Sequence, residues 1–423
     1  MKVVKSSELT CMQEELSRPS ERHSEFVLGT VARIFDRVET EGDQALLTFA
    51  QEFDGHQLCD LKPTAFQVES ALKSLSHELC KAVEVAEINI RTYHAAQQRT
   101  PLRLETAPGI ICERRVLPIE RVGLYVPGGT APLFSTLLML AVPAKLAGCK
   151  EIAVVSPPPI HPITLAVAEI LELTELYQVG GAQAIAALSL GTDTIRPVSK
   201  IFGPGNQYVT AAKQYALQTT GVAVDLPAGP SEVLVVADDS ANPNFVAADL
   251  LSQAEHGVDS QVILLSDSEA LITKVVDAIQ TQLESLSRKD LASQVIDNSV
   301  AVLTADLEQA ISISNDYAPE HLIIACQDVE NLKSLVTNAG SVFLGYYTPE
   351  SLGDYASGAN HTLPTGGSAR AYSGVSLESF QKVVTFQSAS EKGLRDIAPV
   401  VECMALAEGL DAHAKAVAVR FGR

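Results

Sequence analysis

Two side chains near the end of an expected helix are of the types that a mixed nitrogen and oxygen metal site uses. Gln253 and His256 stand three residues apart, which places them on one face of a helix. Asn242 can cap the start of this helix, with Pro243 in its first turn, and Gly257 marks its end. Such pairs are more often satisfied polar groups at a helix end, so a metal site needs further ligands.

An adjacent carboxylate and imidazole form a second polar site. Glu320 and His321 follow Pro319 and come directly before the apolar run 321–324, which is expected to be a strand. Histidine titrates near neutral pH, and burial can raise the pKa of a glutamate, so the pair suits proton transfer. The alternative is that both side chains are solvated at the entry to a strand.

Other segments hold further candidate ligands and a candidate nucleophile. Asp354 and His361 lie in a glycine-flanked polar loop and could face the same cleft, although an aspartate after glycine is also a common turn residue. His413 lies on an expected C-terminal helix, where a single histidine is commonly a surface or core residue. Ser231 lacks the G-x-S-x-G turn of a hydrolase nucleophile, so we discount that role.

Three glycine-containing turns could present backbone amides to a phosphate. They are residues 126–130, 180–183 and 203–206, each expected after a strand and before a helix. None is the G-x-G-x-x-G fingerprint of a dinucleotide site. The simpler interpretation is a set of tight turns that use glycine for its backbone freedom.

These segments must be positioned by an α/β fold. Residues 1–100 are expected to be mostly helical, and no glycine or proline interrupts the helical pattern of residues 69–99. From about residue 120, continuous apolar runs alternate with helical patterns, which indicates two parallel sheets that are buried on both faces. A ligand is then expected in the cleft between the two units, at the carboxyl ends of the strands.

The expected elements of the two units can be given by residue range. The strands are expected at 152–155, 233–236, 262–265, 300–303, 321–324 and 342–344. The helices are expected at 165–173, 182–190, 208–217, 243–256, 269–287, 306–315 and 329–337. From about residue 376 the chain is expected to be helical again, with residues 400–420 forming an amphipathic tail or arm.

Length, charge and cysteine usage narrow the class of protein. A chain of 423 residues is expected to form more than one domain. Its formal net charge of −20 argues against nucleic acid or an anionic membrane as a partner. The seven cysteines include no Cys-x-x-Cys pair, and neither a signal-peptide core nor a bilayer-spanning apolar run is present. We therefore expect a cytoplasmic protein.

Seven segments together resemble the histidinol dehydrogenase family, which catalyses the last step of L-histidine biosynthesis. The resemblance extends from about residue 20 to the C-terminus. It is carried by RVGLYVPGGTAPLFSTLLMLAVPAKLAGC, VGGAQAIAAL, KIFGPGNQYVTAAK, DLPAGPSEVLVVAD, DLLSQAEHG, DYAPEHLI and GDYASGANHTLPT. Segments of this length and specificity make a chance match implausible.

The resemblance implies a role for each candidate residue. The ligands of one zinc ion per subunit would be Gln253, His256, Asp354 and His413. The acid–base pair would be Glu320 and His321. The substrate would be contacted by Ser231, Gln253, His256, His321, Asp354, His361, Glu408 and His413. NAD+ would lie against Tyr125, Gln183 and Asn206.

The implied activity is that of an NAD-dependent alcohol and aldehyde dehydrogenase. L-histidinol would be oxidised through L-histidinaldehyde to L-histidine in a sequential four-electron reaction that uses two NAD+. His321 would take the hydroxyl proton, and Glu320 would activate the water that hydrates the aldehyde. The family is homodimeric, so a C-terminal arm that crosses to the partner would bring Glu408 and His413 into the other subunit's site.

The pattern and the resemblance together imply four parts of the chain. Residues 1–105 would be a mostly helical region that packs with the second α/β domain. Residues 106–229 would be the first of two incomplete Rossmann-like domains, on the NAD side. Residues 230–375 would be the second, with the zinc and acid–base residues, and residues 376–423 would be a helical dimerisation arm.

Two alternative functions stay open at this point. Zinc beside a glutamate and a histidine also activates water, so a metal-dependent hydrolase is the second hypothesis. A relative that binds without catalysis is the third hypothesis. It predicts a broken ligand set, whereas all four implied ligands are present.

Overall fold

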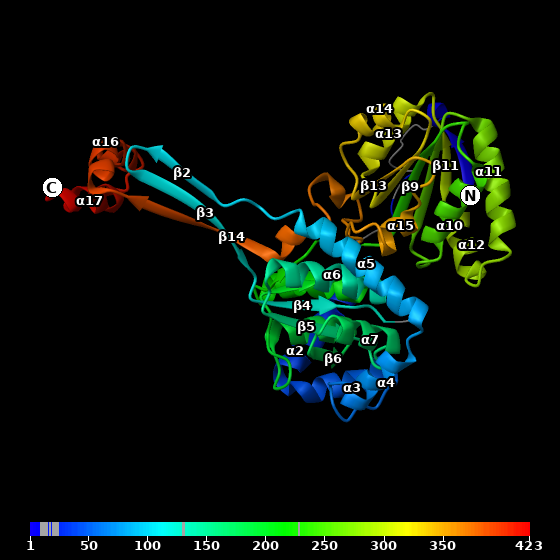
Figure 1. Cartoon of the computed structure of the whole chain (residues 1–423), viewed down its shortest axis with the longest axis horizontal. Helices are drawn as coiled ribbons and strands as arrows, with labels where there is room; N and C mark the ends of the chain where they lie inside the picture. The colour runs from blue at the N-terminus through cyan, green and yellow to red at the C-terminus, as the bar shows by residue number, and fades with distance from the viewer. Residues whose placement is uncertain (9–15, 17, 19–24, 129–131, 227–228) are drawn as a thin grey trace.

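Two α/β domains lie side by side, and a long arm extends away from them (Figure 1). The computed structural model describes residues 1–8, 16, 18, 25–128, 132–226 and 229–423. Each domain is built on a parallel sheet, as the alternation of apolar runs and helical patterns predicted. None of the helices in these ranges is long and apolar enough to cross a membrane.

The first domain contains a five-stranded parallel sheet in the order β6-β5-β4-β7-β8. Its strands are β4 (Arg121–Tyr125), β5 (Glu151–Ser156), β6 (Glu175–Gln178), β7 (Lys200–Phe202) and β8 (Ala223–Val224). Its helices are α6 (Phe134–Ala147), α7 (Pro162–Ile170), α8 (Gly181–Leu190) and α9 (Gln207–Thr219). Val154 packs into the core on one face of the sheet and Val155 into the core on the other, which is why the strand is continuously apolar.

The second domain contains a six-stranded parallel sheet in the order β1-β11-β10-β9-β12-β13. Its strands are β1 (Lys2–Lys5), β9 (Glu232–Ala237), β10 (Gln261–Ser266), β11 (Val300–Leu303), β12 (His321–Ala325) and β13 (Ser341–Leu344). Its helices are α10 (Pro243–Ala254), α11 (Glu269–Leu283), α12 (Lys289–Asp297), α13 (Leu307–Tyr317), α14 (Val329–Leu335) and α15 (Glu350–Tyr355). Val235 and Val236 face opposite cores here too.

Both sheets share one strand order although the two halves show no sequence repeat. Numbered along the chain within each domain, the strands lie in the order 3-2-1-4-5, and β1 is added outside the third strand of the second domain. This is the doubly wound order without its sixth strand. The expectation of two incomplete Rossmann-like units is therefore matched by the topology.

The N-terminal region divides between the two domains. β1 pairs with β11 in the second sheet and is followed by η1 (Ser6–Glu8). The helices pack instead on the first domain, α2 against α8 and α9, α4 against α7, and α5 against α6 (Figure 1). They are α2 (Glu25–Glu41), α3 (Asp43–Asp54), α4 (Ala65–Ser74) and α5 (His77–Ala95). The predicted packing with the second domain holds for α5, whose Asn89 side chain donates to the Ala356 carbonyl at 2.8 Å. It is wrong for α2, because the apolar stripe with Val31 and Phe35 enters the first domain's core.

The continuous helical pattern of residues 69–99 is interrupted in the structure. Leu75 adopts an extended backbone between α4 and α5. The Ser76 hydroxyl then accepts a hydrogen bond from the Leu79 N–H at 3.1 Å, which caps the start of α5. A serine cap can start a new helix without any glycine or proline.

The arm is a three-stranded antiparallel sheet that ends in a pair of helices. The sheet has the order β14-β3-β2, and the helices lie at its far end (Figure 1). Its elements are β2 (Leu102–Ala107), β3 (Ile110–Pro118), β14 (Gln381–Ala389), α16 (Glu391–Ala407), α17 (Asp411–Ala418) and η4 (Val419–Phe421). The predicted boundaries placed residues 102–118 outside the arm and made it wholly helical. Both predictions are wrong, because β2 and β14 are largely exposed and lack the continuous apolar runs that marked the buried strands.

The chain between α15 and the arm connects the two domains. It contains η2 (Ser368–Arg370) and η3 (Leu377–Phe380). The Asn360 side-chain amide donates to the Met139 carbonyl of α6 at 2.6 Å. Phe380 stacks on Phe202 of the first sheet, with ring centroids 4.1 Å apart. The second domain is therefore tied to the core of the first.

A buried histidine lies at this connection. His94 of α5 directs Nδ1 to the Ile90 carbonyl at 2.8 Å and Nε2 to the Asn360 side-chain nitrogen at 3.4 Å. Since a carbonyl only accepts, Nδ1 carries the proton and Nε2 accepts from the amide. Burial lowers the pKa of His94 below its usual 6.5, so the folded protein keeps a neutral imidazole here.

We expect His94 to make the folded state less stable as the pH falls below about 6.5. The unfolded chain takes up a proton at this residue below its ordinary pKa, whereas the folded chain resists protonation, so acid favours unfolding. Between pH 7 and pH 5, wild type should lose up to about 2 kcal/mol more unfolding free energy than His94→Gln, as measured by urea unfolding. His77→Gln, at the exposed start of α5, should follow wild type. Parallel pH profiles for wild type and His94→Gln would refute the assignment.

Candidate active site

The peptide groups of Glu232 hold the predicted acid–base pair. Glu232 begins β9 and His321 begins β12, the neighbouring strand in the sheet. The Glu232 N–H donates to Glu320 Oε2 at 2.9 Å, and the Glu232 carbonyl accepts from His321 Nδ1 at 3.0 Å. Because Nδ1 is therefore protonated, the lone pair of the imidazole lies on Nε2, which is buried and has no hydrogen-bond partner among the described residues.

Burial sets the protonation states of this pair. It lowers the pKa of His321 to about 3, with smaller contributions from His256 and His361. The imidazole is thus neutral at physiological pH, with Nε2 free to accept a proton. Burial also raises the pKa of Glu320 well above its usual range, and the nearby carboxylates of Glu232 and Asp354 raise it further.

The pair lies at the amino ends of the strands of the second sheet. The strand and helix pattern predicted a site at the carboxyl ends, which is wrong for this domain. At the amino edge, the starts of β9 and β12 meet the end of α10, since a crossover helix returns the chain to that edge. The end of α10 carries Gln253, so the acid–base pair and the predicted metal ligands come together there.

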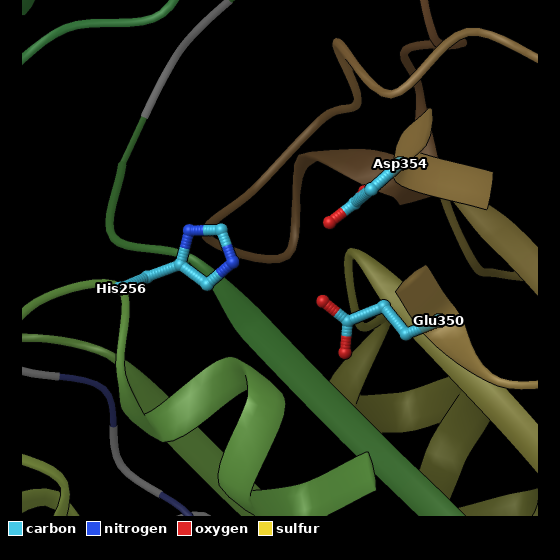
Figure 2. Close-up of side chains that lie close together, drawn as sticks. All are labelled: His256, Glu350 and Asp354. Atoms are coloured by element: carbon cyan, nitrogen blue, oxygen red, sulfur yellow. The ribbon is translucent and has the colours of Figure 1, made fainter. Parts of the chain in front are cut away.

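Three side chains near this edge could hold a metal ion. One ligand atom from each of His256, Glu350 and Asp354 lies within 4.8 Å of the others, and Figure 2 shows the three side chains directed toward one space. Glu350 and Asp354 are four residues apart on α15 and so share a face. Burial raises the pKa of Asp354 to about 6, and burial with neighbouring carboxylates raises that of Glu350. A cation would relieve this crowding of negative charge.

Gln253 lies against the same cluster. It is fully buried, and with its amide nitrogen toward Glu350 it donates to that carboxylate while its oxygen accepts from the Glu232 N–H at 3.3 Å. The predicted cap at Asn242 and the first-turn Pro243 of α10 are confirmed. The helix ends at Ala254, so His256 lies in the following turn, where its N–H donates to the Gln253 carbonyl at 3.2 Å.

His361 lies between the site and the first domain. Its Nδ1 donates to the Asp354 carbonyl at 3.0 Å, and its Nε2 lies 3.3 Å from the Thr136 hydroxyl of α6. Burial lowers the pKa of His361 to about 4. His361, Ser231 and Glu320 line a small cavity of about 60 Å³ together with residues 203–205 of the first domain. The structure therefore brings Ser231 and His361, two of the predicted substrate contacts, together with the predicted acid–base residue Glu320.

Glu408 and His413 are not brought to this site within one chain. Glu408 follows α16 and His413 lies on α17, and both are exposed at the far end of the arm (Figure 1). If they act at the site described above, they act at that of another subunit.

The three predicted NAD contacts line one larger cavity in the first domain. This cavity has a volume of about 580 Å³ and is lined by Tyr125, Gln183 and Asn206. Tyr125 is the last residue of β4, and Gln183 and Asn206 follow the carboxyl ends of β6 and β7, so the cavity lies at the edge predicted for this domain. The Tyr125 hydroxyl accepts from the Gly181 N–H at 3.1 Å, and the Asn206 side chain caps α9. The predicted turn 126–130 lies partly outside the described residues.

A buried ion pair supports the turn that presents Asn206. Lys213 of α9 pairs with Asp225, and both side chains are almost fully buried. Asp225 accepts from the Gly203 N–H at 2.8 Å, and Lys213 donates to the Gly203 carbonyl at 3.0 Å. Both backbone groups of Gly203 are thus held by one charge pair.

Two residues of the site were missed from the sequence. Glu350 carries a signal that was available, since it precedes Asp354 by one helical turn. Glu232 carried none, because it acts through its peptide groups at the start of an apolar strand. Its side chain forms a two-point ion pair with Arg18, at 2.5 and 3.0 Å.

Comparisons with known proteins identify the family of this chain. A family model described as Histidinol dehydrogenase matches residues 16–421. The chain belongs to the histidinol dehydrogenase family. The member from Bacteroides fragilis (strain YCH46) is 50% identical over 425 residues, which cover 100% of this chain and 99% of that protein. The member from Xylella fastidiosa (strain Temecula1 / ATCC 700964) is 50% identical over 428 residues, with the same shares covered.

The fold of the family is confirmed by a solved member. The crystal structure of histidinol dehydrogenase from Elizabethkingia anophelis matches with a TM-score of 0.96 and 48% sequence identity, covering 100% of this chain and 98% of that chain. The resemblance predicted from the seven segments is therefore confirmed. The chain is an oxidoreductase of a family that serves histidine biosynthesis.

Removal of the Glu232 side chain should destabilise the protein strongly. Glu232→Ala removes the carboxylate that forms the two-point ion pair with Arg18, whose side chain is only 17% exposed. We expect the unfolding free energy to fall by about 3–5 kcal/mol in urea titrations, the usual cost of breaking a buried pair from one side. The control is Glu378→Ala, which removes an exposed pair with Arg99 and should cost less than about 1 kcal/mol. Equal small losses would show that the buried pair has no special role.

Proposed function

We propose that this chain is a zinc-dependent histidinol dehydrogenase that oxidises L-histidinol to L-histidine with two NAD+ in turn. The observation that carries the proposal is one edge of the second sheet, where the acid–base pair lies beside a cluster of nitrogen and oxygen ligands. Membership of the family supports histidinol as the substrate.

The residues at this edge fit a zinc ion. Gln253, His256 and Asp354 supply nitrogen and oxygen donors, and His413 of the partner subunit would complete the set. Glu350 accepts from the Gln253 amide and so orients it. When bound, zinc would anchor the amino and imidazole nitrogens of histidinol and act as a Lewis acid.

His321 serves as the base of the first oxidation. Its Nε2 is neutral, unprotonated and buried, with the opposite nitrogen fixed by the Glu232 carbonyl. It takes the proton of the substrate hydroxyl while the carbon that bears this hydroxyl gives hydride to NAD+. The products of this step are histidinaldehyde and NADH.

Glu320 serves in the second oxidation. Water adds to the aldehyde carbon, and the proton that the water loses passes to the ionised form of Glu320. A carboxyl whose pKa is raised by burial is a stronger base once ionised than an ordinary carboxylate. The oxyanion of the hydrate then gives hydride to a second NAD+, and the remaining hydroxyl proton passes to solvent, which leaves the carboxylate of histidine.

A second copy of the chain is the best candidate to cover the arm. Large apolar side chains are exposed on α16, among them Val400 at 55%, Met404 at 61% and Leu406 at 57%. Such a cluster on a thin extension is typical of a subunit interface. We therefore propose a homodimer in which the arm of each subunit reaches the active site of the other. The arm carries Glu408 and His413 far from the site of their own subunit, which agrees with this arrangement.

The first test joins metal content to cofactor reduction. Protein supplied with zinc, NAD+ and histidinol should produce NADH, and purified protein should contain about one zinc per chain by elemental analysis. His256→Ala should lose zinc and NADH production together, by at least about a hundredfold in rate, whereas His77→Ala at the exposed start of α5 should lose neither. A metal-dependent hydrolase would bind zinc but reduce no NAD+, and that outcome would reject the dehydrogenase.

The second test asks which subunit supplies His413. Glu320→Gln and His413→Ala should each be nearly inactive alone. In a mixed dimer, one site combines both lesions and the other is intact, so about a quarter of wild-type activity should return when the two variants are co-expressed.

The matched control for this test combines Glu320→Gln with His256→Ala. Both of these lesions lie in the body of the subunit, so no intact site can form and activity should stay low. If the His413→Ala mixture is no more active than this control, His413 does not act across subunits.

A further inference from the structure

An aspartate on the wall of the 580 Å³ cavity has an unused hydrogen-bond acceptor. Asp54, the last residue of α3, lines this cavity together with Tyr125 and Asn206. Its Oδ2 is shielded from solvent and has no hydrogen-bond partner in the described part of the chain. A buried acceptor without a donor is costly, so a ligand that brings donors would be bound favourably at this point.

The helix that carries Asp54 is firmly attached to the first domain. At its start, Asp43 accepts from the Thr194 hydroxyl at 2.5 Å, and Phe49 in its middle is buried in the core. Asp54 therefore sits on a rigid element, which a precise polar contact requires.

The side chains around Asp54 suit the adenosine half of a dinucleotide. Phe53 and Phe26 line the same cavity although they are 56% and 69% exposed, so both rings keep apolar surface there, with Phe53 stacked on Phe49. Flat aromatic surfaces of this kind stack on a nucleotide base. No lysine or arginine is found among the described residues that line the cavity.

We propose that the Asp54 carboxylate accepts hydrogen bonds from the ribose hydroxyls next to adenine and thereby selects NAD+ over NADP+. This inference rests on the proposed use of a nicotinamide dinucleotide. A carboxylate pairs well with the two hydroxyl donors of a ribose, whereas it repels the phosphate that replaces the 2′-hydroxyl in NADP+. A cavity built for NADP+ would place an arginine there instead.

The electrostatics of the cavity agree with this assignment. Burial raises the pKa of Asp54, and the charge of His56 opposes that shift. The Asp54 charge in turn contributes to raising the pKa of the Tyr125 hydroxyl, which places the two groups near one another on the cavity wall. Donors from a ligand would stabilise the ionised carboxylate that selects the ribose.

The test measures binding rather than turnover. Dissociation constants of wild type and Asp54→Asn are measured by calorimetry for NAD+, NADP+ and the NAD+ analogue that lacks the 2′-hydroxyl on its adenosine ribose. Asp54→Asn should weaken NAD+ about tenfold and leave NADP+ no weaker, so the preference for NAD+ should fall at least about tenfold. The dissociation constant of the deoxy analogue should change less with Asp54→Asn than that of NAD+, because the analogue lacks one of the hydroxyl donors.

The matched control is Glu52→Gln. Glu52 lies on the same helix as Asp54, and its substitution removes the same charge. Among the described residues, it is not part of the cavity lining and forms an exposed ion pair with Arg37. It should leave all three dissociation constants unchanged. Equal losses for both variants would mean that charge alone matters and would overturn the proposal.

The failure of this inference can be told from failure of the proposed function. If wild type binds NAD+ while Asp54→Asn keeps the wild-type preference between NAD+ and NADP+, the role of Asp54 is wrong and the dehydrogenase stands. If wild type binds neither dinucleotide, the dehydrogenase and the role of Asp54 both fail.

Discussion

The two peptide groups of Glu232 hold both proton-transfer side chains, and the candidate active site depends on this double hydrogen bond. The N–H orients Glu320 and the carbonyl fixes the tautomer of His321. The parallel register of β9 with β12 pairs His321 with Val233, and this places both peptide groups of Glu232 within reach of the two side chains. Because the site is buried, a misplaced donor or acceptor would be costly, which keeps the arrangement in one form. The ion pair between Glu232 and Arg18 anchors the same residue from its side-chain end.

The two domains share a strand order but use opposite edges of their sheets. The proposed cofactor cavity lies at the carboxyl ends of the first sheet, whereas the acid–base pair lies at the amino ends of the second. The edges are joined where Thr136 of α6 contacts His361 and where Asn360 donates to the Met139 carbonyl. The proposed hydride transfer between these two edges would need a defined separation, so the contacts between the domains would bear on catalysis as directly as the proposed catalytic residues.

The arm explains why part of the proposed site lies far from the rest. A thin antiparallel sheet cannot bury its own faces, and its terminal helices expose Val400, Met404 and Leu406. An extension of this kind gains stability when it packs against another subunit. In the proposed dimer, the apolar surface that holds the subunits together also delivers His413, so assembly and metal binding would be coupled.

Local patterns were sufficient for most elements of the two domains and for the choice of most candidate site residues. Apolar runs predicted both parallel sheets, Asn242 and Pro243 marked the start of α10, and residue types singled out Glu320, His321, Gln253 and His256. The motifs also identified the family. They did not predict that the N-terminal helices join the first domain, that residues 102–118 belong to the arm, or that the amino edge of the second sheet carries the site. Those features depend on contacts between residues that are far apart in the chain. A peptide group such as that of Glu232, or an unused oxygen such as that of Asp54, acquires its role only when tertiary packing surrounds it and removes water.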